Sequence, residues 1–197
     1  MLHDIADSSI KSLLENKRLK CTSCKAGTLI PSFLESQFRC HTCDNCGGNW
    51  ILIEDYFAWK ERHPEFEFHA DSIESIDSED TSKALLCPVT GGIMSKFRIS
   101  KDSPHRLDYS SRVGGVWLDK GEWELLVAEG LAGSLNAILT EQWQHKVKLD
   151  SARDTMEALY RNRFGDVDYE KAKQIRDWLD AHEHKDELRR FIMSPQS

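Results

Sequence analysis

Cys21-Thr-Ser-Cys24 and Cys43-Asp-Asn-Cys46 form two Cys-x2-Cys pairs separated by residues 25–42. Each pair places two sulfurs on a tight turn, and a β-hairpin between the turns brings four thiolates to the corners of a tetrahedron. In such a closed site the Zn–S bonds are about 2.3 Å and no position is left for water. The spacing therefore predicts one structural Zn²⁺, bound by Cys21, Cys24, Cys43 and Cys46. Two disulfides or a thioredoxin-like redox pair are the alternatives, and the local pattern favours neither.

The composition is that of a folded chain. With 197 residues and 40% hydrophobic content, the protein can bury one large core or two small ones. The N-terminus lacks the basic and apolar regions of a secretion signal, and the sequence contains no run of 18 apolar residues. Four of the six cysteines have metal-type spacing, which agrees with a reducing compartment. We therefore expect a cytoplasmic protein without a membrane segment.

The net charge of -7 is concentrated in one stretch. Residues 61–86 carry eight acidic and two basic side chains, whereas the flanking regions are close to neutral. Charge runs of this kind are typical of solvated linkers. We interpret 61–86 as an acidic linker.

The linker separates two copies of one pattern. In each copy a Gly-Gly pair precedes a tryptophan, Trp50 in the first and Trp117 in the second. The positions of the four first-copy cysteines are occupied in the second copy by Cys87, Thr90, Ser110 and Val113. A hydroxyl or methyl group cannot replace a thiolate, so the second copy is not expected to bind zinc.

The order Cys-x2-Cys, hairpin, Cys-x2-Cys-Gly-Gly-x-Trp resembles the transcription factor IIB-type zinc ribbon of small prokaryotic proteins. In that family the tryptophan typically begins the motif Trp-Leu-Asp-x-Gly-Glu-Leu. The first copy continues Trp50-Ile51-Leu52, while the second keeps Trp117-Leu118-Asp119-Lys120-Gly121-Glu122-Trp123. The resemblance covers residues 20–60 and 86–126, and it implies binding to nucleic acid or to a transcription complex.

Hydrophobic periodicity predicts two hairpins and a helical tail. The hairpins are Thr28–Leu34 with Ser36–Cys40 and Ile93–Ser100 with His105–Ser110. Helices are expected over Leu2–Arg18, Glu54–Arg62, Asp119–Glu129, Ser134–Arg163, Asp168–Ala181 and Lys185–Met193. The pair His182 and His184 is interpreted as a solvated turn, with metal binding as the alternative.

Local motifs add three expectations around the second tryptophan. Asp119 should cap the helix that follows it, with Glu122 reaching back in a capping box. The Gly-Gly pairs should turn the backbone through positive φ. Trp117 should pack with Val116, Leu118 and Leu125.

The fold class is therefore α+β, with two small zinc-ribbon-like hairpin modules in tandem followed by a helical C-terminal region. The expected segments are an N-terminal helix at 1–19, a zinc ribbon at 20–60, the acidic linker at 61–86, a degenerate repeat without zinc at 87–130 and the helical region at 131–197.

No catalytic constellation is evident, because the sequence has no phosphate-binding glycine loop and no metal site with an open position. We interpret Asp108, Asp119 and Glu122 as residues of caps and turns. Cys40 is either a buried thiol or an alternate ligand, and Cys87 is a remnant of a lost site.

We expect a non-enzymatic adaptor that docks on a protein partner through its zinc ribbon and helical tail. The alternative is a nucleic-acid-binding or transcription accessory factor. Nonspecific nucleic-acid binding depends on Lys and Arg, and acidic neighbours offset the charge of the densest cluster of basic residues in this sequence. That cluster is Lys11, Lys17, Arg18, Lys20, Lys25 and Arg39.

Overall fold

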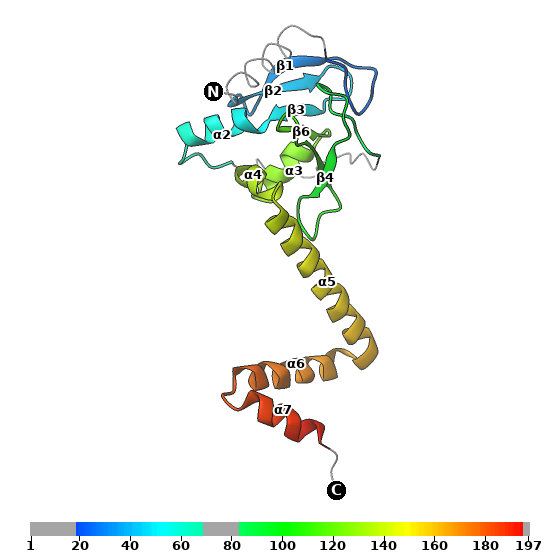
Figure 1. Cartoon of the computed structure of the whole chain (residues 1–197), viewed down its shortest axis with the longest axis vertical. Coiled ribbons are helices and arrows are strands. Elements are labelled where there is room, and N and C mark those ends of the chain that lie inside the picture. The colour runs from blue at the N-terminus through cyan, green and yellow to red at the C-terminus, as the bar shows by residue number, and fades with distance from the viewer. Residues whose placement is uncertain (1–18, 69–82, 195–197) are drawn as a thin grey trace. The chain divides into compact units, whose positions relative to one another are not determined.

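The computed structural model describes residues 19–68 and 83–194 (Figure 1). The chain forms two compact units, Met1–Lys148 and Leu149–Ser197. The first unit contains the β-strands and both cysteine pairs, and the second is helical. The helix expected over Leu2–Arg18 lies outside the described residues, as do residues 69–82 of the expected linker.

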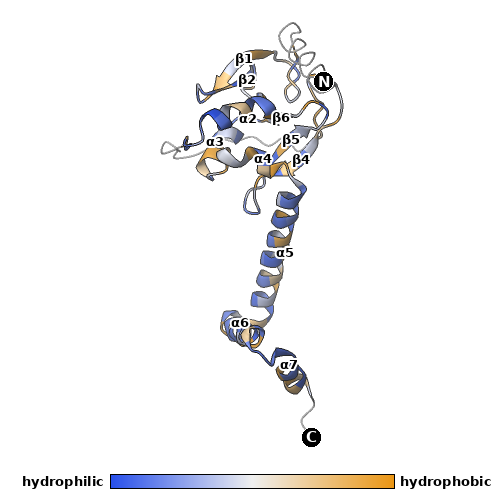
Figure 2. Ribbon diagram, turned by 60° about the vertical axis from the view of Figure 1, so that its left-hand side comes forward, coloured by the Kyte–Doolittle hydropathy of each residue, from blue (hydrophilic) through white to orange (hydrophobic). Residues whose placement is uncertain are grey.

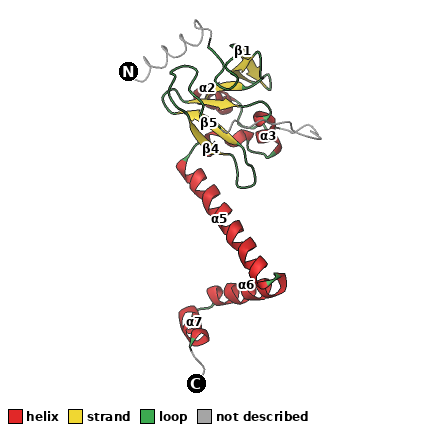
Figure 3. Cartoon of the chain, turned by 90° about the vertical axis from the view of Figure 1, so that its right-hand side faces the viewer, coloured by secondary structure: helices red, strands yellow, loops and turns green. Residues whose placement is uncertain are grey.

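One antiparallel sheet of six strands forms the centre of the first unit (Figure 3). The strand order is β1-β2-β3-β6-β5-β4, so the first three strands and the last three meet at β3 and β6. Both hairpins expected from the sequence are present, but they share this one sheet. The strands are β1 Leu29–Leu34, β2 Phe38–Cys43, β3 Asn49–Leu52, β4 Ser95–Arg98, β5 Arg106–Ser110 and β6 Gly115–Leu118.

The two central strands place the tryptophans opposite each other, with Trp50 paired to Trp117. Successive side chains of a strand point to opposite faces, so both indoles lie on one face while Ile51 and Val116 lie on the other. The expectation that Trp117 packs with Val116, Leu118 and Leu125 was therefore wrong. Those three residues belong to the core on the opposite face.

Three helices and a short 3-10 turn cover the face that carries Ile51. They are α2 Ile53–Arg62, α3 Glu122–Ala128, the 3-10 turn Ala132–Ser134 and α4 Leu135–Ile138. Phe38 lies at the centre of this core, with ring centroids 5.6 Å from Tyr56 and 5.2 Å from Trp123. The Tyr56 hydroxyl donates a hydrogen bond of 2.8 Å to the Ala132 carbonyl, which ties α2 to the 3-10 turn.

The chain remains on this core after α2 ends. The rings of Phe66 and Trp59 are 5.0 Å apart, and those of Phe68 and Trp123 are 5.3 Å apart. Phe66 and Phe68 therefore pack on the core, although they fall within the stretch expected to be solvated.

Helix α3 begins differently from the expected capping box. Its N-cap is Gly121, at a φ of 84°, and not Asp119. The Asp119 carboxylate instead accepts a hydrogen bond of 2.8 Å from the indole nitrogen of Trp117. The other half of the prediction is confirmed, because Glu122 Oε2 accepts a hydrogen bond of 2.8 Å from the Asp119 amide.

The long helix expected over Ser134–Arg163 is interrupted. Helix α4 ends at Ile138, and α5 spans Glu141–Phe164. Thr140 starts α5 by accepting a hydrogen bond of 3.2 Å from the Trp143 amide, which is N-cap geometry. The Gln144 side chain pairs with both the amide and the carbonyl of Arg98, each at 2.9 Å, and so covers part of the edge strand β4.

The second unit comprises the C-terminal part of α5 together with α6 Asp166–Ala181 and α7 Lys185–Met193. Arg161 holds the corner between α5 and α6, because it bonds to Glu157 at 2.9 Å and to Asp166 at 3.1 Å. Its guanidinium also lies 4.3 Å from the centre of the Tyr169 ring. Figure 2 shows hydrophilic and hydrophobic residues mixed along all three helices. None of the helices in 19–68 and 83–194 combines the length and the apolar character that a membrane span requires.

Candidate metal centre

The four cysteines predicted as ligands converge at one end of the sheet. The Sγ atoms of Cys21, Cys24, Cys43 and Cys46 all lie within 4.8 Å of one another. Two of the sulfur pairs are closer, with Cys21 to Cys46 at 3.6 Å and Cys24 to Cys43 at 3.7 Å. A tetrahedron with bonds of about 2.3 Å has edges of roughly 3.8 Å. The four cysteines are therefore positioned to bind one zinc ion.

Backbone hydrogen bonds shape the turn that carries the first cysteine pair. The Cys21 amide donates to the Gly27 carbonyl at 3.0 Å, and the Leu29 amide donates to the Leu19 carbonyl at 2.8 Å. This pairing closes a loop in which Cys21 and Cys24 project to the same side. An added Cβ at Gly27 would lie 2.4 Å from Cys43 Sγ, so a side chain at that position would intrude on the metal site.

The second pair sits where β2 turns into β3. The Cys43 amide donates to the Gly48 carbonyl at 2.8 Å, and the Gly47 amide donates to the Cys43 carbonyl at 3.1 Å. Gly47 has a φ of 74°, as the Gly-Gly motif predicted, and Gly114 in the second half has a φ of 60°. These turns let the chain reverse within a few residues and bring Cys46 back beside Cys43.

Amide groups point at two of the sulfurs. Gly27 N lies 3.4 Å from Cys24 Sγ, and the amides of Asn45 and Cys46 each lie 3.4 Å from Cys43 Sγ. Such donors stabilise the thiolate, which is the form that coordinates zinc. The donor set and its hydrogen bonds therefore fit a structural metal site.

The thiol pKa values reflect the competition between burial and these donors. Burial raises the pKa of Cys21 well above its usual range and that of Cys46 to about 11. Burial also acts to raise the pKa of Cys24, but hydrogen bonds from Gly27 and Asn45 outweigh it and lower that pKa to about 6. Zinc binds the deprotonated form, so metal loading at neutral pH displaces protons from Cys21 and Cys46.

Residues 20–62 match a protein-family model described as the transcription factor zinc-finger, the transcription factor IIB-type zinc ribbon. The match includes both cysteine pairs, β1 to β3 and α2, and covers less than a quarter of the chain. Searches of curated proteins and of solved structures found no match. The matched segment is a zinc ribbon whose four cysteines are placed for one zinc ion.

Cys40 lies apart from the four ligands. It is three residues from Cys43 on the same strand, so the two side chains point to opposite faces of the sheet. Its sulfur lies 3.6 Å from Thr42 Oγ1 in the core covered by α2, and burial raises its pKa. The structure thus places Cys40 as a buried thiol and not as an alternate ligand.

In the second half of the sheet, two of the positions that correspond to the zinc ligands lie in an apolar environment. Cys87 is buried, and Val89 and Val113 pack against the same cluster, which also contains both central tryptophans. In the described part of the chain, the four cysteines are the only group of metal-binding side chains whose ligand atoms converge, and His182 and His184 are not in such a group.

Several charged side chains are more deeply buried than the sequence suggested. Asp108 lies on β5, where its carboxylate pairs with the Lys96 ammonium at 2.8 Å, and so it is not a turn residue. Glu122 is the first residue of α3, and its buried Oε1 lies 3.6 Å from His105 Nδ1. The expected strand His105–Ser110 already placed Asp108 on a strand, but the alternation of side chains along a strand does not show whether the face that carries Asp108 is buried. We assign these pairs to the interior of the fold.

Proposed function

We propose that this protein is a zinc-stabilised, non-enzymatic adaptor that docks on a protein partner through its C-terminal helices. The zinc ribbon stabilises the first unit, and the second unit presents the docking surface. The observation that carries the proposal is the exposure of large apolar side chains on α6 and α7.

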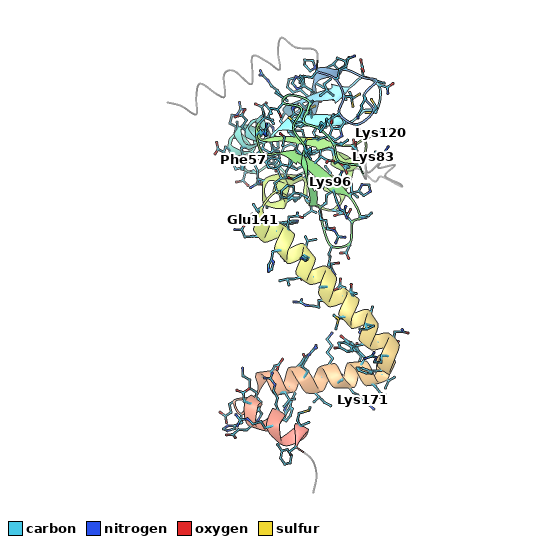
Figure 4. The ribbon with its side chains drawn as sticks, turned by 45° about the vertical axis from the view of Figure 1, so that its right-hand side comes forward. Phe57, Lys83, Lys96, Lys120, Glu141 and Lys171 are labelled. Carbon is cyan, nitrogen blue, oxygen red and sulfur yellow. The ribbon has the colours of Figure 1, made fainter. Side chains whose placement is uncertain are left out.

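Helix α6 exposes three large apolar side chains on one side, and polar residues lie between them. Val167, Ile175 and Trp178 follow each other at helical spacing on one side, and each is more than half exposed. Together with Ile175 and Trp178, the side chains of Lys171 and Gln174 line a shallow groove. Figure 4 shows Lys171 projecting from α6 away from the helix axis. The energetically dominant residues of protein interfaces are enriched in Trp, Tyr and Arg, so the exposed Trp178 is the expected anchor.

Helix α7 extends the apolar surface. Phe191 and Met193 are largely exposed, and Ile192 is half exposed. Tyr169 is the only buried residue in the described part of the second unit, residues 149–194. Three helices with so little interior packing gain little stability from their own contacts. A partner that covers Trp178 and Phe191 would supply the missing burial.

Matched variants of α6 test the docking surface. Trp178→Ala should reduce capture of the partner from an extract of the native cell at least tenfold, because an interface anchor typically contributes 2 kcal/mol or more. Asp177→Ala changes the neighbouring exposed residue and should leave capture unchanged. Nuclease treatment of the extract should have no effect. Equal capture by both variants would contradict the proposal.

A transcription or nucleic-acid role is the second candidate, and the family match over residues 20–62 favours it. The acidic overall charge opposes it, because each phosphate contact requires a cation. We expect a duplex DNA dissociation constant no tighter than about 10⁻⁴ to 10⁻⁶ M at physiological salt, the usual nonspecific range. Tight, sequence-dependent binding in a gel-shift titration would make this candidate the leading one.

We further infer that residues 87–130 are a degenerate copy of the ribbon. The Cys87 amide donates to the Gly92 carbonyl at 2.7 Å, and the Met94 amide donates to the Leu85 carbonyl at 3.0 Å, as in the first turn. The Thr22 hydroxyl donates to the Leu86 carbonyl and links the two loops directly. Apolar packing of Cys87 and Val113 then substitutes for zinc in the second copy.

A further inference from the structure

Two arginines lie directly opposite each other on neighbouring strands at the end of the sheet. Arg98 of β4 pairs with Arg106 of β5. The Ile99 amide donates to the His105 carbonyl at 3.3 Å, whereas the backbone of Arg98 bonds outward to the Gln144 side chain. Arg98 and Arg106 therefore form a non-hydrogen-bonded pair, the closer of the two antiparallel arrangements, in which the Cα atoms are about 4.5 Å apart.

This arginine pair lies on the face of the sheet that carries the central tryptophans. Lys96 pairs with Asp108, and Asp108 pairs with Trp117. Residues two apart on a strand point to the same face, so Arg98 and Arg106 share the face of Trp117. Helices α2, α3 and α4 cover the opposite face. Arg106 is exposed and Arg98 is half-buried, so the pair is open to solvent.

The nearby carboxylates are engaged elsewhere. Asp108 pairs with the Lys96 ammonium at 2.8 Å, and Asp119 accepts a hydrogen bond from the Trp117 indole. Both carboxylates are buried. In the described part of the chain, no carboxylate forms an ion pair with either member of the arginine pair. Like charges directly opposite each other in a sheet are destabilising, so the pair has a cost that no described ion pair offsets.

The charge around the pair selects an anionic ligand. A guanidinium presents a planar fork of donors that matches a carboxylate bidentately. In Figure 4, Lys83 and Lys120 lie on the same side of the first unit as Lys96, and both are exposed. The net charge of -7 opposes a long polyanion, whose affinity depends on many phosphate contacts. A short segment with a few carboxylates meets only the local positive charge.

We propose that Arg98 and Arg106 bind neighbouring carboxylates of a short acidic segment in a protein partner. Binding replaces the repulsion between the two guanidinium groups with two charge-assisted pairs. The site belongs to the first unit and does not require the docking surface on α6 and α7. A free acidic peptide therefore tests it separately from partner capture.

Fluorescence anisotropy of the zinc-loaded full chain measures this binding. The probe is a labelled peptide of alternating aspartate and serine, and the matched peptide has asparagine in place of aspartate. Wild-type protein should bind the aspartate peptide only, and added salt should weaken the binding. Arg106→Gln should weaken it about tenfold or more, because it removes hydrogen bonds to a charged group. Arg106→Lys should retain part of the affinity, since it keeps the charge and loses the fork.

Arg112→Gln is the matched control, because it removes the same charge from an exposed arginine beyond the opposite end of β5. It should leave peptide binding unchanged. The melting temperature of Arg106→Gln should equal or exceed that of the wild type, because the substitution relieves like-charge repulsion.

Four outcomes would overturn the proposal. Wild-type protein could fail to bind the aspartate peptide, or could bind the asparagine peptide equally well. Equal weakening by Arg106→Gln and Arg112→Gln would show an effect of net charge alone. A lower melting temperature of Arg106→Gln would give that arginine a structural role. Tighter binding of a single-stranded oligonucleotide of the same charge would assign the surface to nucleic acid.

Discussion

Trp50 and Trp117 lie opposite each other on the two central strands, and each ring lies against a glycine, Gly115 of β6 for Trp50 and Gly48, just before β3, for Trp117. An added Cβ at Gly115 would lie 2.0 Å from the Trp50 ring, and one at Gly48 would lie 2.3 Å from the Trp117 ring. The two indoles and the two glycines thus form one reciprocal contact at the centre of the sheet. This contact joins the half that holds the metal site to the half that does not.

The glycine contacts make a direct prediction. Gly115→Ala should destabilise the protein by about 1–3 kcal/mol, the usual range for overpacking a core, because the new methyl group would overlap the Trp50 ring. Urea unfolding in the presence of zinc measures the effect. Gly133→Ala is the control, since a Cβ there meets nothing within 4 Å. Similar stabilities for the two variants would contradict the packing described for Trp50.

Zinc content tests the metal centre. Purified protein should contain one zinc per chain, and Cys43→Ser should lose it, because three thiolates do not complete the structural site. Structural zinc contributes on the order of 10 kcal/mol, and β3 pairs with β6, so the loss should unfold the whole sheet. Cys40→Ser should retain the metal. A measured content of two zincs per chain would show that the second half also binds a metal.

The two tryptophans should respond differently to the same substitution. The Trp117 indole donates to the buried Asp119 carboxylate, whereas the indole nitrogen of Trp50 is buried without a hydrogen-bond partner in the described structure. Leu52 occupies the position that corresponds to Asp119. Trp117→Phe should therefore cost about 1–3 kcal/mol more than Trp50→Phe, because it removes a hydrogen bond to a charged group. Thermal unfolding of the two variants measures this difference, and equal losses of stability would contradict the prediction.

Alkaline pH should destabilise the protein through Tyr56. Burial raises the pKa of Tyr56 from 10.0 to about 12. Below pH 10 the phenol is protonated in both the folded and unfolded chain, so it adds no pH dependence. Between pH 10 and 12 the unfolded chain releases this proton first, so the free energy of unfolding should fall by about 2–3 kcal/mol.

Tyr56→Phe is the matched variant for that prediction. It should lose about 1 kcal/mol at pH 8, because the hydrogen bond to the Ala132 carbonyl is gone. Above pH 10 its stability should decline less than that of the wild type in urea titrations at pH 8, 10 and 11. Parallel declines of the two proteins would assign the alkaline sensitivity to other groups.

The proposed repeat predicts that the lost metal site can be restored. Thr90→Cys, Ser110→Cys and Val113→Cys together would complete a four-cysteine set with Cys87 at the ribbon spacing. The triple variant should bind a second zinc, and adding Cys87→Ser should abolish that second site only. A triple variant that still binds one zinc would indicate that the second half does not have ribbon geometry.

The sequence alone determined the elements whose signals are local. The two Cys-x2-Cys pairs identified the metal ligands, because each pair lies on one turn and the hairpin between them is short. Both hairpins and the helices Glu54–Arg62 and Lys185–Met193 followed from residue periodicity over a few turns. The positive φ of Gly47 and Gly114 followed from the Gly-Gly motif. In each case residues close in sequence supply the stabilising contacts.

Only the tertiary structure decided how these elements combine. The pairing of Trp50 with Trp117 joins strands about 65 residues apart, and neither strand carries a local signal for its partner. That pairing set which face each tryptophan occupies and placed Val116 in the other core. These contacts depend on which surfaces become covered when distant segments meet, and local propensity and spacing do not contain that information.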